Sequence, residues 1–314
     1  MPRSGHTGST ATDPIQAMTL LLTGASGFVG RHVQAAMDCV PLEEGDELVE
    51  LRDYGALRDA VRRVKPDRVL HLAAQSNPPR SFEDPEETFA INFTGTHNLL
   101  QALREIGFKG RLLFVGSGDM YGLVPQNELP VTENRPLKPR NPYAVSKVAA
   151  EALCFQWSLN SGFEIVLVRP FNHVGPGQSP DYALPGFAAQ LAEMRAGRRE
   201  AVLETGDLSV TRDFCDVRDV VRAYALLLDQ GRNGEVYNIC SGQERNLEEI
   251  VADLIRLADV PVRMEQRADK MRPVEQPRMV GSHEKLTGET GWTPEIPWER
   301  TLQDLFDDWM DRIP

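Results

Sequence analysis

Three glycines between an apolar run and a helical run constrain the fold of this chain more than any other feature. The run Met18–Thr23 has the continuous apolar character of a buried strand, and Phe28–Cys39 has helical spacing. The joining residues read T-G-A-S-G-F-V-G. Gly24 permits a tight turn, Gly27 lets a diphosphate approach the backbone, and Gly30 lets the helix pack closely on the strand. Because a helix N-terminus offers free N–H groups and a positive dipole end, this segment predicts a dinucleotide-binding unit.

Short apolar runs and helical runs alternate as far as about residue 170. Three further apolar runs are typical of strands in a parallel sheet, where both faces are buried: Arg68–Ala73, Arg111–Gly116 and Glu164–Val168. Helical spacing occurs between them in Tyr54–Val64, Pro85–Glu105 and Tyr143–Asn160. This order predicts a parallel sheet with right-handed crossovers. We therefore expect an α/β fold in which residues 18–170 form a Rossmann domain, a doubly wound parallel sheet that binds NAD(P).

The chain changes texture after Pro170, with more Pro, Gly and Arg. Helical spacing continues in four segments, and one further segment is a candidate strand: Leu184–Ala196, Val217–Leu228, Leu247–Ala258 and Trp298–Met310, with the strand at Val236–Cys240. We expect residues 171–314 to form mainly a smaller C-terminal α/β substrate lobe, interleaved with the last Rossmann strands. Ligands of open α/β sheets bind beyond the carboxyl ends of the strands, so the two lobes should meet there.

Composition and charge exclude several classes of function. The chain has 34 Lys and Arg residues against 46 Asp and Glu residues, and its net charge of −12 repels nucleic acid and anionic membranes. No apolar run approaches the length that crosses a bilayer, and residues 1–17 lack the apolar region of a signal peptide, which indicates a disordered leader or tag. The four cysteines form neither a C-x-x-C pair nor a zinc-binding spacing. We expect a cytoplasmic protein with no metal, no membrane and no nucleic-acid partner.

A tyrosine and a lysine stand one helical turn apart in the segment N-P-Y-A-V-S-K at residues 141–147. Positions i and i+4 share one face of a helix, so the ammonium of Lys147 should lie beside the phenol of Tyr143. A neighbouring cation stabilises the phenolate and lowers the pKa of a tyrosine from its ordinary value near ~10. Tyr143 could then exchange a proton with a substrate oxygen near neutral pH. Ser117 follows the run Arg111–Gly116, where its hydroxyl could bind the same oxygen.

Together these features resemble the nucleotide-sugar branch of the extended short-chain dehydrogenase/reductase family, over roughly residues 18–312. The glycine spacing G-x-x-G-x-x-G and the group Ser/Thr–Tyr–Lys are both typical of that family. The resemblance implies that Ser117, Tyr143 and Lys147 are catalytic. It also implies a cofactor-binding set drawn from the glycine loop, the strand ends and the catalytic helix: Gly24, Ser26, Gly27, Phe28, Val29, Gly30, Glu50, Leu51, Leu72, Ala73, Ala74, Asn92, Tyr143, Lys147 and Pro170.

Parts of that set keep alternatives open. Asn92 matches an asparagine that the family places near the active site, and a structural hydrogen-bonding role fits it equally well. His71, at a strand end, is interpreted as structural. A ribose-binding acid would favour NAD, and three glutamates compete for that role: Glu43, Glu44 and Glu50. Arg31 or Arg52 could instead hold the 2′-phosphate of NADP. We expect NADP(H), with NAD(H) as the alternative.

The segment R-P-F-N-H-V-G-P-G-Q at residues 169–178 indicates the reaction. It resembles the corresponding stretch of GDP-6-deoxy-D-mannose reductases, as do residues 117–119, 140–143, 211–214 and 237–243. Sugar 4,6-dehydratases carry Thr-Asp-Glu or Thr-Ser-Glu after the strand. Here Gly118 cannot donate a proton and Asp119 is one methylene shorter than Glu, so dehydration is disfavoured.

The resemblance therefore implies reduction of the C4 ketone of GDP-4-dehydro-6-deoxy-D-mannose to GDP-D-rhamnose. Hydride would come from NAD(P)H, and Tyr143 would protonate the developing alkoxide. The implied contacts to this GDP-linked 4-keto-6-deoxy sugar lie in both lobes: Gln75, Ser117, Gly118, Asp119, Tyr143, Asn172, Arg212, Arg272 and Glu275. Relatives pair the helices that correspond to Pro85–Glu105 and Tyr143–Asn160, so we expect a homodimer through a four-helix bundle.

Other activities compete with this interpretation. A nucleotide-sugar 4-epimerase or a GDP-mannose 4,6-dehydratase-like enzyme would use the same fold but would retain its cofactor through the cycle. A ketose linked to another base, dTDP or UDP, is a further alternative. A non-catalytic NAD(P)-binding sensor belongs to a different class, and such proteins usually lose the tyrosine or the lysine. Both Tyr143 and Lys147 are present here.

Overall fold

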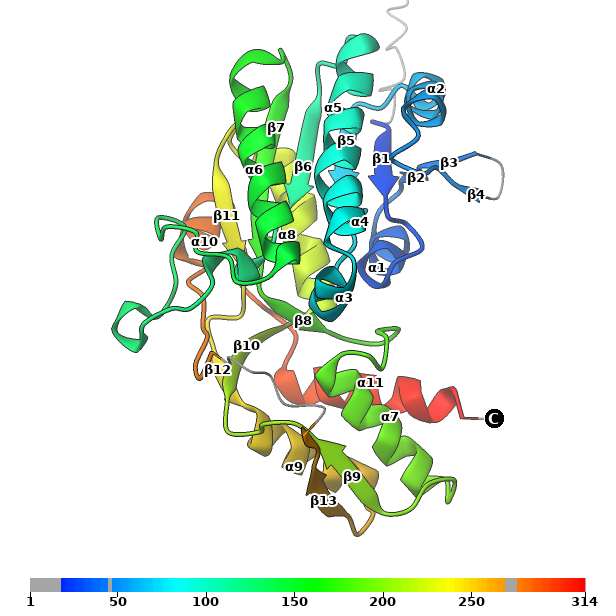
Figure 1. Cartoon of the computed structure of the whole chain (residues 1–314), viewed down its shortest axis with the longest axis vertical. Helices are drawn as coiled ribbons and strands as arrows, with labels where there is room; N and C mark the ends of the chain where they lie inside the picture. Colours follow the sequence, from blue (N-terminus) through cyan, green and yellow to red (C-terminus); the bar gives the residue numbers. More distant parts are fainter. Residues whose placement is uncertain (1–17, 45–46, 269–275, 314) are drawn as a thin grey trace, which may run out of the picture.

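The computed structural model describes residues 18–44, 47–268 and 276–313 and places them in two lobes (Figure 1). The first lobe is built on a six-stranded sheet with the order β11-β7-β6-β5-β1-β2. Its strands are β1 (Leu20–Thr23), β2 (Val40–Pro41), β5 (Arg68–His71), β6 (Arg111–Val115), β7 (Glu164–Pro170) and β11 (Val236–Ile239). Each neighbouring pair is parallel. The expected α/β fold with a doubly wound parallel sheet is confirmed.

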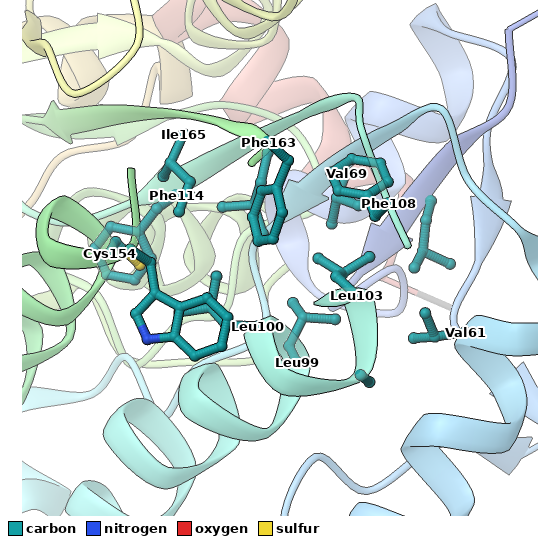
Figure 2. Close-up of a cluster of buried hydrophobic side chains, with 14 of the residues drawn as sticks. Val61, Val69, Leu99, Leu100, Leu103, Phe108, Phe114, Cys154, Phe163 and Ile165 are labelled. Atoms are coloured by element: carbon teal, nitrogen blue, oxygen red, sulfur yellow. The ribbon is translucent and has the colours of Figure 1, made fainter. Parts of the chain in front are cut away.

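Helices bury both faces of this sheet. Successive residues of one strand enter opposite hydrophobic clusters, as Leu21 and Leu22 do on β1. One face is covered by α2 (Tyr54–Val64), α5 (Gly95–Glu105) and α6 (Pro142–Asn160), and the other by α1 (Phe28–Ala36) and α8 (Val217–Gln230). Figure 2 shows the first of the two clusters, around Val69 and Phe114. Because both faces are covered, the strands have continuous apolar sequences.

The expected helix over Pro85–Glu105 is continuous but not uniform. It begins as α4 (Pro85–Phe89), passes through a π-helical turn over Ala90–Thr94 and ends as α5. The π turn contains the buried residue Asn92. π turns of this kind often occur at functional sites. A short helix that the apolar pattern does not predict, α3 (Pro78–Glu83), precedes α4.

The second lobe combines small sheets with three helices. One sheet has the order β12-β10-β8, with β8 (Asn172–Val174), β10 (Thr211–Asp216) and β12 (Glu244–Asn246), and β9 (Val202–Thr205) pairs with β13 (Arg263–Gln266). The helices α7 (Ala183–Arg195), α9 (Leu247–Ala258) and α11 (Trp298–Asp311) share one hydrophobic cluster. In the first lobe, the hairpin β3 (Glu43–Glu44) and β4 (Glu47–Leu48) joins β2 to α2, and α10 (Glu284–Thr290) packs beside β11. The boundary at residue 170 stays a prediction.

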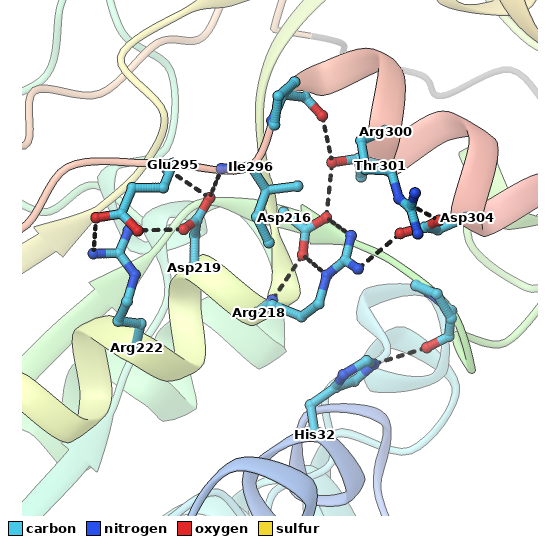
Figure 3. A network of polar contacts seen from close by, with 12 residues as sticks. His32, Asp216, Arg218, Asp219, Arg222, Glu295, Ile296, Arg300, Thr301 and Asp304 are labelled. Atoms are coloured by element: carbon cyan, nitrogen blue, oxygen red, sulfur yellow. Dashed lines mark hydrogen bonds and ion pairs between the residues drawn. The ribbon is translucent and has the colours of Figure 1, made fainter.

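Ion pairs and hydrogen bonds join the two lobes where α8 begins (Figure 3). Asp216 caps α8 by accepting a hydrogen bond of 2.8 Å from Arg218 N. Its carboxylate also accepts a hydrogen bond of 2.7 Å from Thr301 Oγ1, and Arg218 Nη1 donates to Asp304 Oδ2 at 2.7 Å. Thr301 and Asp304 both belong to α11. These contacts therefore fix α11 of the second lobe on α8 of the first.

Candidate active site

The glycine loop between β1 and α1 has the geometry of a phosphate cradle. Gly24 has φ +73°, and a Cβ built on it would lie 2.8 Å from Ala73 N, so no other residue fits there without strain. A Cβ on Gly30 would lie 2.2 Å from Gly24 O. Gly27 stands at the N-cap of α1, and its lack of a side chain leaves the first-turn N–H groups without a side-chain cap. The loop therefore presents backbone donors to an anion.

His71 lies beneath this loop as a structural histidine. Thr23 Oγ1 accepts from Ala73 N at 3.1 Å, so its hydroxyl proton is directed to His71 Nδ1, 2.8 Å away. On the other side of the ring, Thr96 Oγ1 donates to Asn92 O and accepts from His71 Nε2 at 2.9 Å. The ring is therefore neutral with its proton on Nε2. Burial, together with the charge of Lys147, lowers the pKa of His71 to about 3.

The side chain of Asn92 is used within the protein. Its Oδ1 accepts from Gln75 N at 2.8 Å, and its Nδ2 donates to Gln75 O at 3.0 Å and to Ser146 Oγ at 2.9 Å. Ser146 Oγ donates in turn to Tyr143 O at 2.7 Å. Asn92 thus connects the segment that follows β5 to the N-terminal part of α6, which is the structural one of its two expected roles. A contact from Asn92 to the cofactor stays a prediction.

Tyr143 and Lys147 lie in the first turns of α6, beside the end of β6. Asn141 caps this helix by accepting from Ala144 N at 2.7 Å, and its Nδ2 donates to Asp119 Oδ2 at 2.6 Å. Tyr143 and Lys147 are 8% and 5% exposed. Ser117 is the N-cap of a 3₁₀ turn (Gly118–Tyr121) and shares a hydrogen bond with the phenol of Tyr143. The structure therefore brings the three expected catalytic side chains together.

The electrostatics of this group differ from the expectation in one respect. Burial raises the pKa of the Tyr143 phenol, and the hydrogen bond from Ser117, not the charge of Lys147, is what opposes the rise. Lys147 Nζ donates instead to Val115 O at 2.8 Å, and burial lowers the pKa of this ammonium to about 8. Because loss of solvent raises the pKa of Tyr143 above its ordinary value, the residue is a protonated phenol at neutral pH. It is a proton donor in this state.

The residues proposed for the adenosine end of a dinucleotide pair with one another. Arg52 Nη2 donates to Glu50 Oε2 at 2.7 Å, and this ion pair lowers the pKa of Glu50. Leu51 between them is buried against Gly95. Arg31 extends across the glycine loop, where its Nη1 donates to Ser26 O at 2.6 Å and its Nη2 to Gly177 O at 2.7 Å. Arg31 therefore bridges the phosphate loop and the second lobe.

The expected substrate residues occupy different positions. Asn172 is exposed on β8, and its Nδ2 makes a long contact of 3.4 Å with Asp213 O. Arg212 Nη1 donates hydrogen bonds to Thr211 O at 2.6 Å and to Gln276 O at 2.7 Å. The buried amide of Gln75 donates to Thr88 Oγ1 at 3.1 Å and to Asn77 O at 3.1 Å, so its side chain faces α3 and α4. Gly118 lies against Phe171. The substrate contacts of these residues stay predictions.

Some expectations fall on parts of the chain outside the described residues. Arg272, Glu275 and the leader 1–17 are among them. Within the described ranges, no group of three or more His, Cys, Asp or Glu side chains could hold a metal ion. No helix in those ranges has both the length and the apolar character of a membrane span.

Tyr182 is a residue of the candidate site that no sequence pattern indicated, and the second lobe brings it close to Tyr143. Tyr182 precedes α7, and its hydroxyl lies 3.4 Å from Ser76 Oγ in the first lobe. It is close enough to Tyr143 to contribute to the raised pKa of that phenol. Ser76 and Tyr182 are 106 positions apart in the sequence, so no local pattern could have paired them. The Pro- and Gly-rich segment before Tyr182 indicated only a loop.

Comparison with known proteins places these features in context. Residues 42–305 match the protein-family model described as GDP-mannose 4,6 dehydratase. The chain is 44% identical over 301 residues to GDP-6-deoxy-D-mannose reductase of Pseudomonas aeruginosa, covering 94% of this chain and 98% of that protein. It is 28% identical over 322 residues to the human dTDP-D-glucose 4,6-dehydratase, covering 93% and 89%.

Solved structures agree with this pattern. The structure of RMD from Pseudomonas aeruginosa complexed with NADPH superposes with a TM-score of 0.89 at 44% identity and covers 94% of this chain and 100% of that chain. The UDP-glucose 4-epimerase of Thermus thermophilus, in complex with NAD, superposes with a TM-score of 0.81 at 28% identity, covering 94% and 100%. The similarity thus extends over both lobes.

Proposed function

Since this chain belongs to the extended short-chain dehydrogenase/reductase family, in the group matched by the GDP-mannose 4,6 dehydratase model, we propose that it reduces the C4 ketone of GDP-4-dehydro-6-deoxy-D-mannose. The product is GDP-D-rhamnose, also called GDP-6-deoxy-D-mannose. One observation carries the choice of reaction: 44% identity to a GDP-6-deoxy-D-mannose reductase over nearly the whole of both chains. The enzyme is thus an NAD(P)-dependent nucleotide-sugar 4-ketoreductase.

The residues present fit a dinucleotide. Gly24 and Gly30 let the loop pack closely on the backbone around it, where a Cβ would clash, and the start of α1 offers N–H groups without a side-chain cap. Ala73 and Ala74 at the end of β5 are small enough for a ligand to lie against the backbone. The structural relative complexed with NADPH supports NADP(H) as the cofactor, with NAD(H) as the alternative. When bound, the reduced cofactor supplies hydride to the substrate.

The catalytic residues of this chain then transfer one proton to the substrate. Ser117 and Tyr143 share a hydrogen bond, so both hydroxyls can converge on the C4 oxygen of the sugar. Reduction turns that oxygen into an alkoxide, which needs a proton. Tyr143 is protonated at neutral pH because burial raises its pKa, and it donates that proton. Lys147, whose pKa is about 8, is mostly charged at pH 7 and stabilises the phenolate that remains.

The group Ser117-Gly118-Asp119 supports reduction over dehydration. Elimination across C5 and C6 of a hexose needs an acid and a base besides the tyrosine. Gly118 packs on Phe171 and carries no such group. Asp119 Oδ2 accepts a hydrogen bond of 2.6 Å from Asn141, which also caps α6. The carboxylate of Asp119 therefore stabilises the N-terminus of α6 through Asn141.

The test combines purified protein with the GDP-linked keto-sugar and either NADPH or NADH. We expect one molecule of reduced cofactor to be oxidised for each sugar that is reduced. The absorbance of the reduced nicotinamide measures the cofactor, and NMR should identify the product as GDP-D-rhamnose. NADPH should be the more efficient cofactor. Conversion of the sugar with no net loss of cofactor would indicate an epimerase or a dehydratase. Turnover only with a dTDP- or UDP-linked ketose would change the assigned substrate.

The outer face of α6 supports a homodimer. Val145, Phe155 and Leu159 are 39%, 48% and 65% exposed on this helix, and the exposed Phe82 lies on the neighbouring α3. Burial of such side chains against a second copy is favourable. We propose that α6 and the helix over Pro85–Glu105 of two copies form a four-helix bundle. Light scattering should give twice the 35.0 kDa of one chain, and Phe155→Glu should give the monomer. The cytoplasmic location stays a prediction.

A further inference from the structure

A buried ion pair lies directly behind the catalytic group. Arg169 Nε donates to Glu151 Oε2 at 2.9 Å, and Arg169 Nη2 donates to Glu151 Oε1 at 2.6 Å. The two side chains are 6% and 8% exposed. Neither residue has a part in the proton transfer described above. Two charges held inside the protein at this position therefore require another explanation.

The position of Glu151 relates it to the catalytic residues. It lies on α6 one helical turn after Lys147 and two turns after Tyr143, and all three side chains are buried. A Cβ built on Gly116, the residue before Ser117, would lie 3.4 Å from Glu151 Oε2. The carboxylate is thus packed between the helix that carries Tyr143 and the strand end that carries Ser117.

Arg169 extends the contact to further segments. Its Nη1 donates to Tyr121 Oη at 2.9 Å and to Glu133 O at 3.3 Å, and its guanidinium lies over the Tyr121 ring. Tyr121 belongs to the same 3₁₀ turn that Ser117 caps. Tyr121 Oη donates to Asn238 Oδ1 at 2.6 Å on β11, and Asn238 Nδ2 donates to Val131 O at 3.0 Å. One network therefore joins α6, β7, β11 and the turn after β6.

Stability alone is a weak reason for such a pair. Removing two charges from water carries a large desolvation cost, and a well-packed apolar pair of similar volume is often as stable or more stable. A fully satisfied polar network instead fixes one arrangement of the segments that it joins, because any shift leaves a buried group unpaired. Here the joined segments are those that carry the catalytic hydroxyls.

We propose that the Glu151–Arg169 ion pair is a positioning device that sets α6 against the turn after β6, and thereby brings Tyr143 to Ser117. The catalytic consequence rests on the proposed function, whereas the geometric claim does not. Glu151 and Arg169 touch neither sugar nor cofactor in this mechanism. Their loss should therefore lower kcat and leave the KM for NADPH unchanged, since the glycine loop is not part of the network.

The experiment compares Glu151→Gln with a control ion pair that involves the other end of β7. Arg111 Nε and Nη2 donate to Glu164 Oε2 at 2.9 and 2.6 Å at the opposite ends of β6 and β7, so Glu164→Gln removes an ion pair away from the site. Each protein is labelled with ¹³Cζ-tyrosine, and the six tyrosines allow assignment by Tyr143→Phe and Tyr121→Phe. Spectra, Tm and kcat are recorded for each variant.

We expect Glu151→Gln to move the Tyr143 and Tyr121 resonances and to lower kcat by about 10- to 100-fold, as a displacement near 1 Å does. Glu164→Gln should leave the Tyr143 resonance and kcat as in the wild type. A folded Glu151→Gln protein with an unchanged Tyr143 resonance overturns the proposal. If Glu151→Gln does not fold, Arg169→Lys keeps the charge without the planar fork, and the same resonance decides. If no keto-sugar is turned over, the proposed function fails, and the spectra still test the positioning claim.

Discussion

The ammonium of Lys147 donates a hydrogen bond of 2.8 Å to the carbonyl of Val115, two residues before Ser117. This bond crosses from α6 to the end of β6 and holds the three proposed catalytic side chains at the carboxyl ends of the strands. The ammonium is buried at this position, and burial lowers its pKa to about 8. Lys147 is therefore both a positioning contact and a group that titrates close to neutral pH.

The pH dependence of turnover follows from this pKa. In the proposed mechanism Lys147 stabilises the phenolate that forms on Tyr143 only while Lys147 is charged, and its pKa is about 8. We expect kcat to be constant at neutral pH and to fall as the pH rises through about 8. Measurement of kcat from pH 6 to pH 10 checks this. A profile with no inflection between pH 7 and pH 10 would contradict the role of Lys147.

Because Lys147 is buried as a charged group, we expect it to lower the free energy of unfolding. Its pKa is about 8 in the folded protein against 10.5 ordinarily, so the folded state binds fewer protons between these values and stability rises with pH there. Below pH 8 the full cost is present. Lys147→Met should raise the free energy of unfolding at pH 7 by about 1–3 kcal/mol, after loss of the bond to Val115, and abolish turnover. Denaturant unfolding at pH 7 and pH 10 should show the gain shrinking at the higher pH.

The neutral state of His71 predicts acid sensitivity. Its pKa is about 3 in the folded protein and near 6.5 when unfolded, so stability is complete above pH 6.5 and is lost as the pH falls towards 3. The loss from His71 between pH 6.5 and pH 5 should be about 2 kcal/mol. The variant His71→Asn should lack this pH-dependent loss of stability. Unfolding free energies of both proteins at the two pH values give the difference, and equal pH slopes would argue against a buried neutral histidine.

Gly24 tests the phosphate cradle. Gly24→Ala places a Cβ 2.8 Å from Ala73 N at a φ of +73°, so we expect loss of NADPH binding together with a stability loss of roughly 1–3 kcal/mol. Gly288 on α10 is the control, because a Cβ there has no atom within 4 Å and Ala is favoured in a helix. Gly288→Ala should bind NADPH as the wild type does. Fluorescence titration with NADPH separates the two variants.

The glycine loop, the parallel sheet and the Tyr-x-x-x-Lys pair could be predicted because each is encoded by local spacing. Gly24, Gly27 and Gly30 follow an apolar run and precede a helix, and Tyr143 and Lys147 are one turn apart. The strands could be recognised because their burial on both faces makes them continuous apolar runs.

Other features depend on tertiary contacts and have no local signal. Ser76 of the first lobe meets Tyr182 of the second from 106 positions away, and Arg169 meets Glu151 only because β7 packs beside α6. The raised pKa of Tyr143 could not be predicted either, since the cation one turn away was visible in the sequence and the loss of solvent was not. A charged residue at a buried helix position, Glu151, was the one available hint.

The measurement that tests the central claim most directly uses NADPH deuterated at the transferred position, with wild-type enzyme, Tyr143→Phe and a control. The control is Tyr54→Phe, whose hydroxyl bonds to Glu105 on the surface away from the site. We predict one deuterium at C4 of GDP-D-rhamnose for each cofactor oxidised by the wild type and by Tyr54→Phe, with the rate of Tyr143→Phe lower by about 10²- to 10⁴-fold. Equal rates for the wild type and Tyr143→Phe, or a product without deuterium at C4, would contradict this mechanism.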